Sequence, residues 1–124
     1  MNMQINIKAK DLELTGDLKE FINQKVKHIE KFLHLSGDQQ ATAEVEIGKE
    51  FGKHHKHGNT IYGEINLSVW GKLFRARELA EDKKVAIEQV VEEIVRQVRR
   101  DKEKKLDLFR RGAGQIKKLL KFGK

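Results

Sequence analysis

The chain contains neither cysteine nor proline among its 124 residues. Without cysteine there is no disulfide framework and no thiolate metal site, which is typical of a protein from a reducing compartment. Without proline, glycine is left to mark the turns. Aromatic residues make up only 6% of the chain, too few for an extended platform on which nucleic-acid bases could stack.

Long apolar runs and enzyme motifs are also missing. No stretch approaches the roughly 18 consecutive apolar residues typical of a membrane-spanning helix, and the N-terminus lacks the basic-then-apolar pattern of an export signal. Neither a phosphate-binding loop, nor a nucleophile elbow, nor a dinucleotide-binding turn occurs. The carboxylates Glu44, Glu46 and Glu64 alternate with apolar residues, as on the solvent face of a sheet. We therefore expect a cytoplasmic protein that is not an enzyme, is not membrane-bound, and needs neither cofactor nor small-molecule substrate.

The net positive charge is confined to the last third of the chain. Segment 83–124 has 14 Lys and Arg against 6 Asp and Glu, a net +8, whereas segment 1–82 has 12 against 13, a net −1. A basic excess confined to one segment is typical of a surface that binds a polyanion, so nucleic acid is the leading candidate partner. The alternative is a solvated basic face that only maintains solubility.

Two kinds of periodicity divide the chain into strands and helices. Alternating apolar and polar residues predict four strands, and apolar residues at helical spacing predict two helices. The strands are expected at Met3–Ala9, Ala43–Ile47, Ile61–Val69 and Phe74–Arg77, and the helices at Thr15–Leu33 and Asp82–Lys105. The order β-α-β-β-β-α indicates an α+β fold, a two-layer sandwich in which two helices pack on one face of a four-stranded sheet. One apolar face on each strand further predicts that the sheet is antiparallel.

The chain is predicted to form one domain over 1–105, followed by a basic C-terminal tail over 106–124. The apolar helical pattern lapses at this boundary, and Gly112 and Gly114 interrupt the stretch that follows, so we expect the tail to be flexible. Its end interleaves leucines with lysines and could form a short amphipathic helix. Such a helix would fold on a ribonucleoprotein surface or, alternatively, bind an acidic membrane.

The second predicted helix carries the strongest candidate interface. Its apolar residues fall in one arc of roughly 140°, while Arg96, Arg99 and Arg100 project outside that arc. Lysine and arginine on such a surface neutralise phosphates and release counterions, which gives salt-dependent binding of RNA or DNA. The alternative is a solvated face with ion pairs inside the helix, such as Glu92 with Arg96.

Three histidines lie between the second and third predicted strands, in Lys53-His54-His55-Lys56-His57. Imidazole is a common metal ligand, and a metal-dependent hydrolase built on this loop is an alternative. However, lysines flank the histidines, and no neighbouring cysteine or acidic residue completes a ligand set. A solvated loop that can contact phosphate is favoured, and we expect no metal.

Residues in both predicted helices resemble one known family. They are Glu81-Asp82-Lys83-Lys84-Val85-Ala86-Ile87-Glu88, then Arg96-Gln97-Val98-Arg99-Arg100, and in the first helix Lys25 with Ile29-Glu30-Lys31-Phe32. With the order of elements, they make the chain similar to the short form of the ribosome hibernation-promoting factors, also called ribosome-associated inhibitors or sigma-54 modulation proteins. The chain departs from the family pattern at Lys83-Lys84, where Met-Tyr is usual, and at Glu93, where Lys is usual.

The resemblance implies a protein that binds the small ribosomal subunit, through 16S-type rRNA and neighbouring ribosomal proteins, and we expect it to act as a monomer. There it would occupy the decoding channel, in the space of messenger RNA and of A- and P-site tRNA, and inhibit translation as a hibernation factor of the stress response. The resemblance carries over Lys25, Lys31, Arg96, Arg99, Arg100 and Lys102 as RNA-binding residues. The charge pattern adds Lys83, Lys84, Lys104, Lys105, Arg110 and Arg111. A general binder of double-stranded or structured RNA is the alternative, and both promotion and blocking of ribosome pairing are compatible with the sequence.

Overall fold

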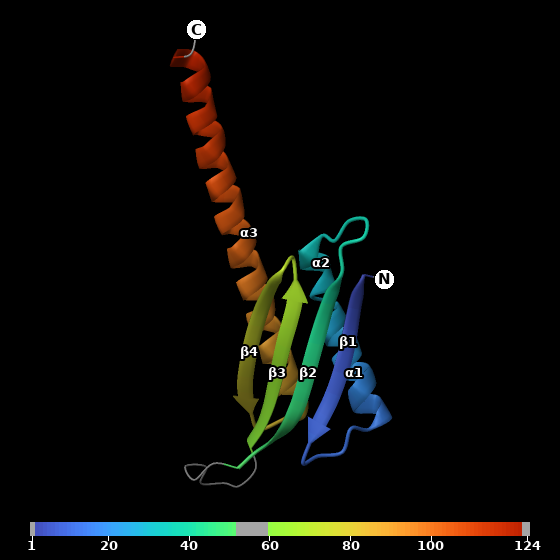
Figure 1. The fold of residues 1–124 in the computed structure, drawn as a ribbon. Helices are drawn as coiled ribbons and strands as arrows, with labels where there is room; N and C mark the ends of the chain where they lie inside the picture. Colours follow the sequence, from blue (N-terminus) through green and yellow to red (C-terminus); the bar gives the residue numbers. More distant parts are fainter. Residues whose placement is uncertain (1, 52–59, 123–124) are drawn as a thin grey trace.

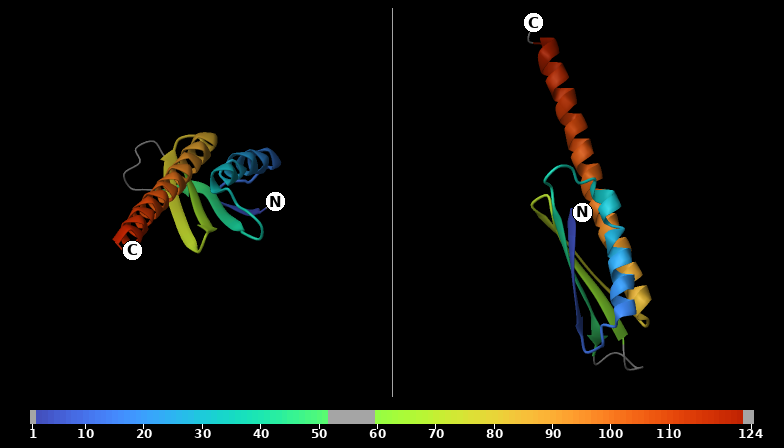
Figure 2. Two further views of the ribbon diagram at one scale, coloured as in Figure 1. Left: turned by 90° about the horizontal axis from the view of Figure 1, so that it is seen from above. Right: turned by 90° about the vertical axis from the view of Figure 1, so that its right-hand side faces the viewer.

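The computed structural model describes residues 2–51 and 60–122, with side chains up to Gly112. Its elements follow the predicted order, with the first helix in two parts (Figure 1). They are the strands β1 (Met3–Lys10), β2 (Ala41–Glu50), β3 (Thr60–Val69) and β4 (Lys72–Ala80), and the helices α1 (Gly16–Lys27), α2 (Glu30–Leu33) and α3 (Lys83–Phe122). The helices cover one face of a four-stranded sheet (Figure 2). This confirms the predicted α+β class and its two layers.

The sheet differs from the prediction in the direction of its first strand pair. The strands are hydrogen-bonded in the order β1-β2-β3-β4. β2 is antiparallel to β3, and β3 to β4, but β1 and β2 are parallel. The predicted all-antiparallel sheet is therefore wrong for this pair. The reason is the helical crossover: α1 and α2 return the chain to the start of β1, so β2 runs in the same direction.

A two-residue turn, Trp70-Gly71, joins β3 to β4. Both residues have positive φ, 55° and 70°, as in the type I′ turns whose twist suits a hairpin. Glycine adopts this conformation freely, whereas a tryptophan there is unusual. The turn places the indole ring next to α3, close to Lys105.

The first helix begins where the sequence predicts and tightens near its end. Thr15 is the N-cap, and its hydroxyl accepts a hydrogen bond from the backbone N–H of Leu18 at 3.2 Å. At the junction of α1 and α2, the N–H groups of His28 and Ile29 bond to the carbonyls three residues earlier, as in a 3₁₀-helix. This tighter turn keeps Ile29 and Leu33 in the core, where both are buried.

The core lies between the sheet and the helices. Its fully buried large side chains come from every layer: Ile22, Val26, Ile29, Leu33, Ile47, Ile65, Leu67, Ile87, Val90, Ile94 and Val98. The close packing of α3 on β3 depends on Gly63. A Cβ added at Gly63 would lie 3.0 Å from the carbonyl oxygen of Ala86, so a larger residue would push the helix away from the sheet.

α3 is longer than predicted. The sequence predicts a helix end near Lys105, but α3 has 40 residues, ends at Phe122 and projects beyond the sheet (Figure 1). An ion pair between residues four apart lies on each side of the predicted end, Lys105–Asp101 before it and Arg111–Asp107 after it, and glycine in a helix costs only about 1 kcal/mol. Within the described residues, no helix is both long and apolar enough to cross a membrane.

Candidate nucleic-acid interface

A groove runs between the first helix pair and α3, which lie beside each other on the same face of the sheet (Figure 2). We call it the helical groove. From the start of α3 onward, it is lined by Phe21, Gln24, Lys83 and Lys84, then Lys25, His28, Glu88, Val91 and Glu92, and finally Val95, Arg96, Arg99 and Arg100. The last part is a hollow of about 420 Å³. It forms because each helix turns its apolar stripe to the sheet, which brings the polar flanks of the helices together.

Charge changes sign along the helical groove. The part near the start of α3 mixes acids with lysines: Asp17, Glu20 and Asp82 with Lys83 and Lys84. The middle contains Lys25, Glu88 and Glu92. The far part holds the three arginines against Glu92 and Glu103. We call this far part the arginine end, and a phosphate is attracted most strongly there.

At the arginine end, an aromatic ring on one wall contacts a cation on the other. The guanidinium carbon of Arg99, on α3, lies 4.9 Å from the ring centroid of Phe32, on α2. His28 packs against the same ring edge-on, with centroids 5.3 Å apart and an interplanar angle of 76°. A cation over an aromatic face at an exposed site contributes about 0.5–1 kcal/mol. The contact therefore orients Arg99 across the groove.

At the other end of the helical groove, the ring of Phe21 also contacts cations. Lys84, from α3, places its Nζ 5.4 Å from the ring centroid of Phe21. Lys25, one turn after Phe21 on α1, places its Nζ 5.6 Å from that centroid. Both contacts are near the 6 Å limit for a cation–π interaction. Each end of the groove thus has a cation held across it by a phenylalanine.

Half of the predicted RNA-binding residues meet in the helical groove: Lys25, Lys83, Lys84, Arg96, Arg99 and Arg100. Lys31 lies beside the groove, in a hollow that also includes His28. The others lie elsewhere on α3: Lys102 and Lys105 against Trp70, and Lys104, Arg110 and Arg111 exposed along the helix. That all twelve bind RNA stays a prediction.

The ion pair at the arginine end differs from the one considered in the sequence. Arg96 pairs with Glu93, three residues before it, and not with Glu92. The amide of Gln97 also contacts Glu93: it donates to Glu93 Oε1 at 3.4 Å and to the carbonyl oxygen of Arg75 on β4 at 2.9 Å. Glu92 lines the groove instead, and it has no ion pair among the described side chains.

Two of the predicted lysines anchor α3 to the β3–β4 hairpin. Lys102 Nζ lies 5.8 Å and Lys105 Nζ 4.8 Å from the ring of Trp70. Asp101 completes the cluster, with Lys72 Nζ 2.5 Å from its Oδ1 and Lys105 Nζ 3.5 Å from its Oδ2. The hydrogen bond from Lys72 is the main reason that the pKa of Asp101 is below its ordinary value, and burial lowers the pKa of Lys102. These lysines hold the helix where it leaves the sheet.

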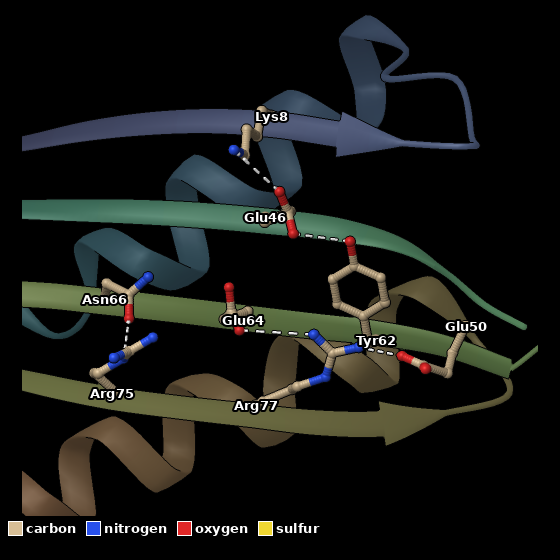
Figure 3. A network of polar contacts seen from close by, with 8 residues as sticks. All are labelled: Lys8, Glu46, Glu50, Tyr62, Glu64, Asn66, Arg75 and Arg77. Atoms are coloured by element: carbon tan, nitrogen blue, oxygen red, sulfur yellow. Dashed lines mark hydrogen bonds and ion pairs between the residues drawn. The ribbon is translucent and has the colours of Figure 1, made fainter. Parts of the chain in front are cut away.

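The face of the sheet away from the helices carries a polar network (Figure 3). The ring of Tyr62 lies over Gly48, where an added Cβ would come within 2.7 Å of it. The Tyr62 hydroxyl donates to Glu46 at 2.8 Å, and the Arg77 guanidinium lies 4.0 Å from the ring centroid. Burial and the hydrogen bond to Glu46 raise the pKa of Tyr62 to about 12, and the same bond lowers the pKa of Glu46. Tyr62 therefore links β2 to β4 across the sheet.

Among the described residues, the polar groups of this face bond to one another, through three ion pairs and two hydrogen bonds between a charged side chain and an asparagine amide. The pairs are Lys8 with Glu46 at 3.2 Å, Arg77 with Glu64 at 3.7 Å, Arg77 with Glu50, Asn6 with Glu44 at 2.9 Å, and Arg75 with Asn66 at 3.0 Å. This confirms that Glu44, Glu46 and Glu64 lie on the solvent face of the sheet. A hollow of about 490 Å³ lies here too, but the polar groups around it already bond to each other. Within the part of the chain that the structure describes, this face therefore has fewer free cationic groups for an anion than the arginine end has.

Sequence reasoning missed the aromatic residues of the interface. Phe21 and Phe32 fit the apolar spacing of a core face, and the structure leaves both partly buried at the edge of the core. One signal was present, because Lys25 follows Phe21, and Phe32 follows His28, by the four residues that bring side chains together on a helix. Their partners on α3 depend on tertiary packing, which the sequence does not show. The predicted loop with His54, His55 and His57 lies outside the described residues.

Comparisons with known proteins place this fold and its basic helices in one family. The family model described as "Sigma 54 modulation protein / S30EA ribosomal protein" matches residues 5–106. The chain belongs to this family. The family predicted from the sequence is thereby confirmed. No curated protein sequence matches the chain.

Two solved structures resemble this member of the sigma 54 modulation/S30EA family. The N-terminal domain of Protein Y from Thermus thermophilus is 25% identical, with a TM-score of 0.62 over 81% of this chain and 98% of that one. A ribosomal subunit interface protein from Coxiella burnetii is 13% identical, with a TM-score of 0.55 over 83% of this chain and 99% of that one, a likeness of fold. All residues that line the helical groove lie inside the family match, whereas the last part of α3 lies beyond it.

Proposed function

We propose that this protein binds the small ribosomal subunit through the helical groove, occupies the decoding channel and inhibits translation in idle ribosomes. The observation that carries the proposal is the arginine end, where Arg96, Arg99 and Arg100 gather beside an aromatic ring. Folded RNA is recognised mostly through its shape and its phosphates, and cations fixed on two rigid helices suit that mode. The names of the two similar structures, a Protein Y domain and a ribosomal subunit interface protein, support a ribosomal partner.

In this proposal the protein acts as a monomer in the cytoplasm and performs no chemistry. Its partners are 16S-type rRNA and the ribosomal proteins that border the channel. The arginine end approaches rRNA phosphates, and the sheet face, whose polar groups bond to one another, points away from them. The basic residues beyond the groove, from Lys104 to Arg111, extend the contact along α3. Such binding holds ribosomes idle by excluding messenger RNA and tRNA.

The decisive experiment removes the three arginines together and measures binding to purified small subunits at several salt concentrations. The variant Arg96→Ala/Arg99→Ala/Arg100→Ala should bind more weakly, and the slope of log K against log salt should fall by about one for each phosphate that the variant no longer binds. A matched control, Lys8→Ala/Lys10→Ala/Arg75→Ala, removes three cations from the sheet instead. It should keep most of the affinity.

Two outcomes would contradict the proposal. If the arginine variant binds as tightly as the wild type at every salt concentration, the helical groove is not the contact surface. If the wild type binds naked duplex RNA as tightly as it binds small subunits, the protein is a general binder of structured RNA. Sedimentation through sucrose gradients with subunits and with duplex RNA distinguishes these cases.

A further inference from the structure

We propose that Phe32 is a positioning residue for RNA binding, whose ring holds Arg99 across the helical groove in readiness for a phosphate. The inference rests on the proposed function, because Arg99 is there a contact to rRNA. Phe32 itself need not touch RNA. Its role is to limit the conformations of a long cationic side chain before the partner arrives, and so to reduce the entropy that binding costs.

The ring of Phe32 is itself held in place. The backbone N–H of Phe32 bonds to the carbonyl oxygen of Ile29 at 3.0 Å, and both Ile29, three residues earlier, and the adjacent Leu33 are buried in the core. His28 then contacts the ring edge-on from the preceding turn, at 5.3 Å between centroids. Arg99 therefore rests on a fixed surface, at 4.9 Å from the ring centroid.

A ring holds a cation without neutralising it, whereas the carboxylate of an ion pair offsets the charge that it holds. Arg96 pairs with Glu93, and Arg111 pairs with Asp107 at 3.2 Å. Arg99 has no ion pair among the described side chains, although Glu103 lies one turn further along α3 and lines the same hollow. Its full charge and its five N–H donors are therefore left for a phosphate, which the guanidinium can bind through two hydrogen bonds at once.

The opposite end of the groove repeats the arrangement. There the ring of Phe21 holds Lys84 of α3 at 5.4 Å, again across the groove. Two independent aromatic–cation contacts thus join the same pair of walls, and this supports a role for the rings in positioning the cations. Simple packing of the helix edges would need no cation on either ring.

The test is a double-mutant cycle that combines Phe32→Leu with Arg99→Ala, with the affinity for purified small subunits as the readout. Phe32→Leu removes the ring but keeps an apolar side chain, and it should weaken binding about two- to fivefold, the range expected from one exposed cation–π contact. In the Arg99→Ala background the same substitution should have no further effect. Phe32→Tyr keeps the ring and should restore wild-type affinity.

Two further variants sharpen this cycle. Phe51→Leu is the matched control, because Phe51 is an exposed phenylalanine, 68% accessible, that has no cation on its ring among the described contacts. It should leave binding unchanged. If Phe32→Leu fails to fold, as judged by circular dichroism, Phe32→Met provides a second variant without a ring and with a longer apolar side chain.

The outcomes separate this inference from the proposed function. An equal loss from Phe32→Leu in both backgrounds means that the ring only packs, and this overturns the inference. Unchanged affinity of Phe32→Leu in the wild-type background overturns it as well. In both cases the groove can still bind the subunit, and the affinity of the triple arginine variant for small subunits tests this separately. A wild type that fails to bind small subunits overturns the proposed function and, with it, the role of Phe32.

Discussion

Arg96 and Arg99 lie three residues apart on α3 and are held by different kinds of partner. Arg96 pairs with the carboxylate of Glu93, whereas Arg99 rests on the ring of Phe32. Tyr62, on the other side of the molecule, combines both roles: its ring carries the guanidinium of Arg77, and its hydroxyl donates to a carboxylate. The two faces thus use the same kinds of contact with different results. Around Tyr62 the guanidinium of Arg77 also pairs with carboxylates, whereas the ring of Phe32 leaves the charge of Arg99 unpaired among the described side chains.

The hydroxyl of Tyr62 can be tested alone. Tyr62→Phe keeps the ring over Gly48 but removes the hydrogen bond to Glu46, so the free energy of unfolding should fall by about 1 kcal/mol. Urea unfolding at neutral pH measures this difference. Ser68→Ala, an exposed position on the same strand, is the control and should change little. An unchanged midpoint for Tyr62→Phe would show that water replaces the hydroxyl at no cost, and RNA binding should not respond in either variant.

α3 combines features that the sequence predicts well with one that it does not. Its start, its apolar stripe and the exposure of Arg96, Arg99 and Arg100 follow from a period of 3.6 residues, because burial on one side imposes that pattern. Its end does not, because the apolar stripe stops near Lys105 while the helix continues to Phe122. The contact of Phe32 with Arg99 joins residues 67 positions apart in sequence, and only the packed helices reveal it.

The sheet shows the same division between local and tertiary information. Strand positions follow from alternation, and burial of Val45 and Ile65 on the helix side agrees with it. The parallel pairing of β1 with β2 does not follow, because alternation is the same in both directions. What decides it is the path of the crossover through α1 and α2, which is a property of several elements together.

The anchoring of α3 at the hairpin should depend on pH through Asp101. Its pKa in the folded protein is below the ordinary 3.8, so the charged form stabilises the fold. That contribution is complete above the pKa of the unfolded state and is lost as the pH falls through the folded pKa. We therefore expect Asp101→Asn to be less stable than the wild type by about 1 kcal/mol at pH 7. The two proteins should converge as the pH falls below about 4.

Urea unfolding at several pH values between 7 and 3 checks this expectation. Asp107→Asn is the matched control, because its carboxylate pairs with Arg111 in an exposed position, where both side chains are more than half accessible. Such pairs contribute little to stability. A difference between Asp101→Asn and the wild type that stays constant across this range would show that the carboxylate does not act through its charge.

The molecule as a unit has two unlike faces on one sheet. The helices present a groove whose arginine end is not fully neutralised, and the opposite face carries charges that pair among themselves (Figure 3). The electrostatic field of a partner rich in phosphates therefore turns the helix side of this molecule toward the partner. Long-range attraction acts on the helix side first, and this orientation raises the rate of productive encounters at low salt.

Truncation after Lys105 tests how the predicted tail contributes to the molecule. Segment 106–124 has 6 Lys and Arg against 1 Asp, and Leu106, Leu108 and Phe109 in it are 49–73% accessible. We expect the truncated chain to unfold at the same urea concentration, because the apolar side chains that the structure describes in this segment are exposed. Its binding to small subunits should weaken, with a slope against salt lower by about 0.9 for each phosphate that the tail neutralises in the full chain. A lower unfolding midpoint would instead show that the segment stabilises the domain.

The Trp70 hairpin gives α3 a fulcrum, the fixed base from which the rest of the helix projects. From Asp101, where Lys72 holds the helix, to its end at Phe122, the rod extends about 30 Å. A tilt of roughly ten degrees at the fulcrum would swing the tip by about 5 Å, nearly the spacing of one helical turn. The direction of the projecting part of α3 is thus set by a few lysine contacts at its base, and a small change in these contacts produces a large displacement of the helix end.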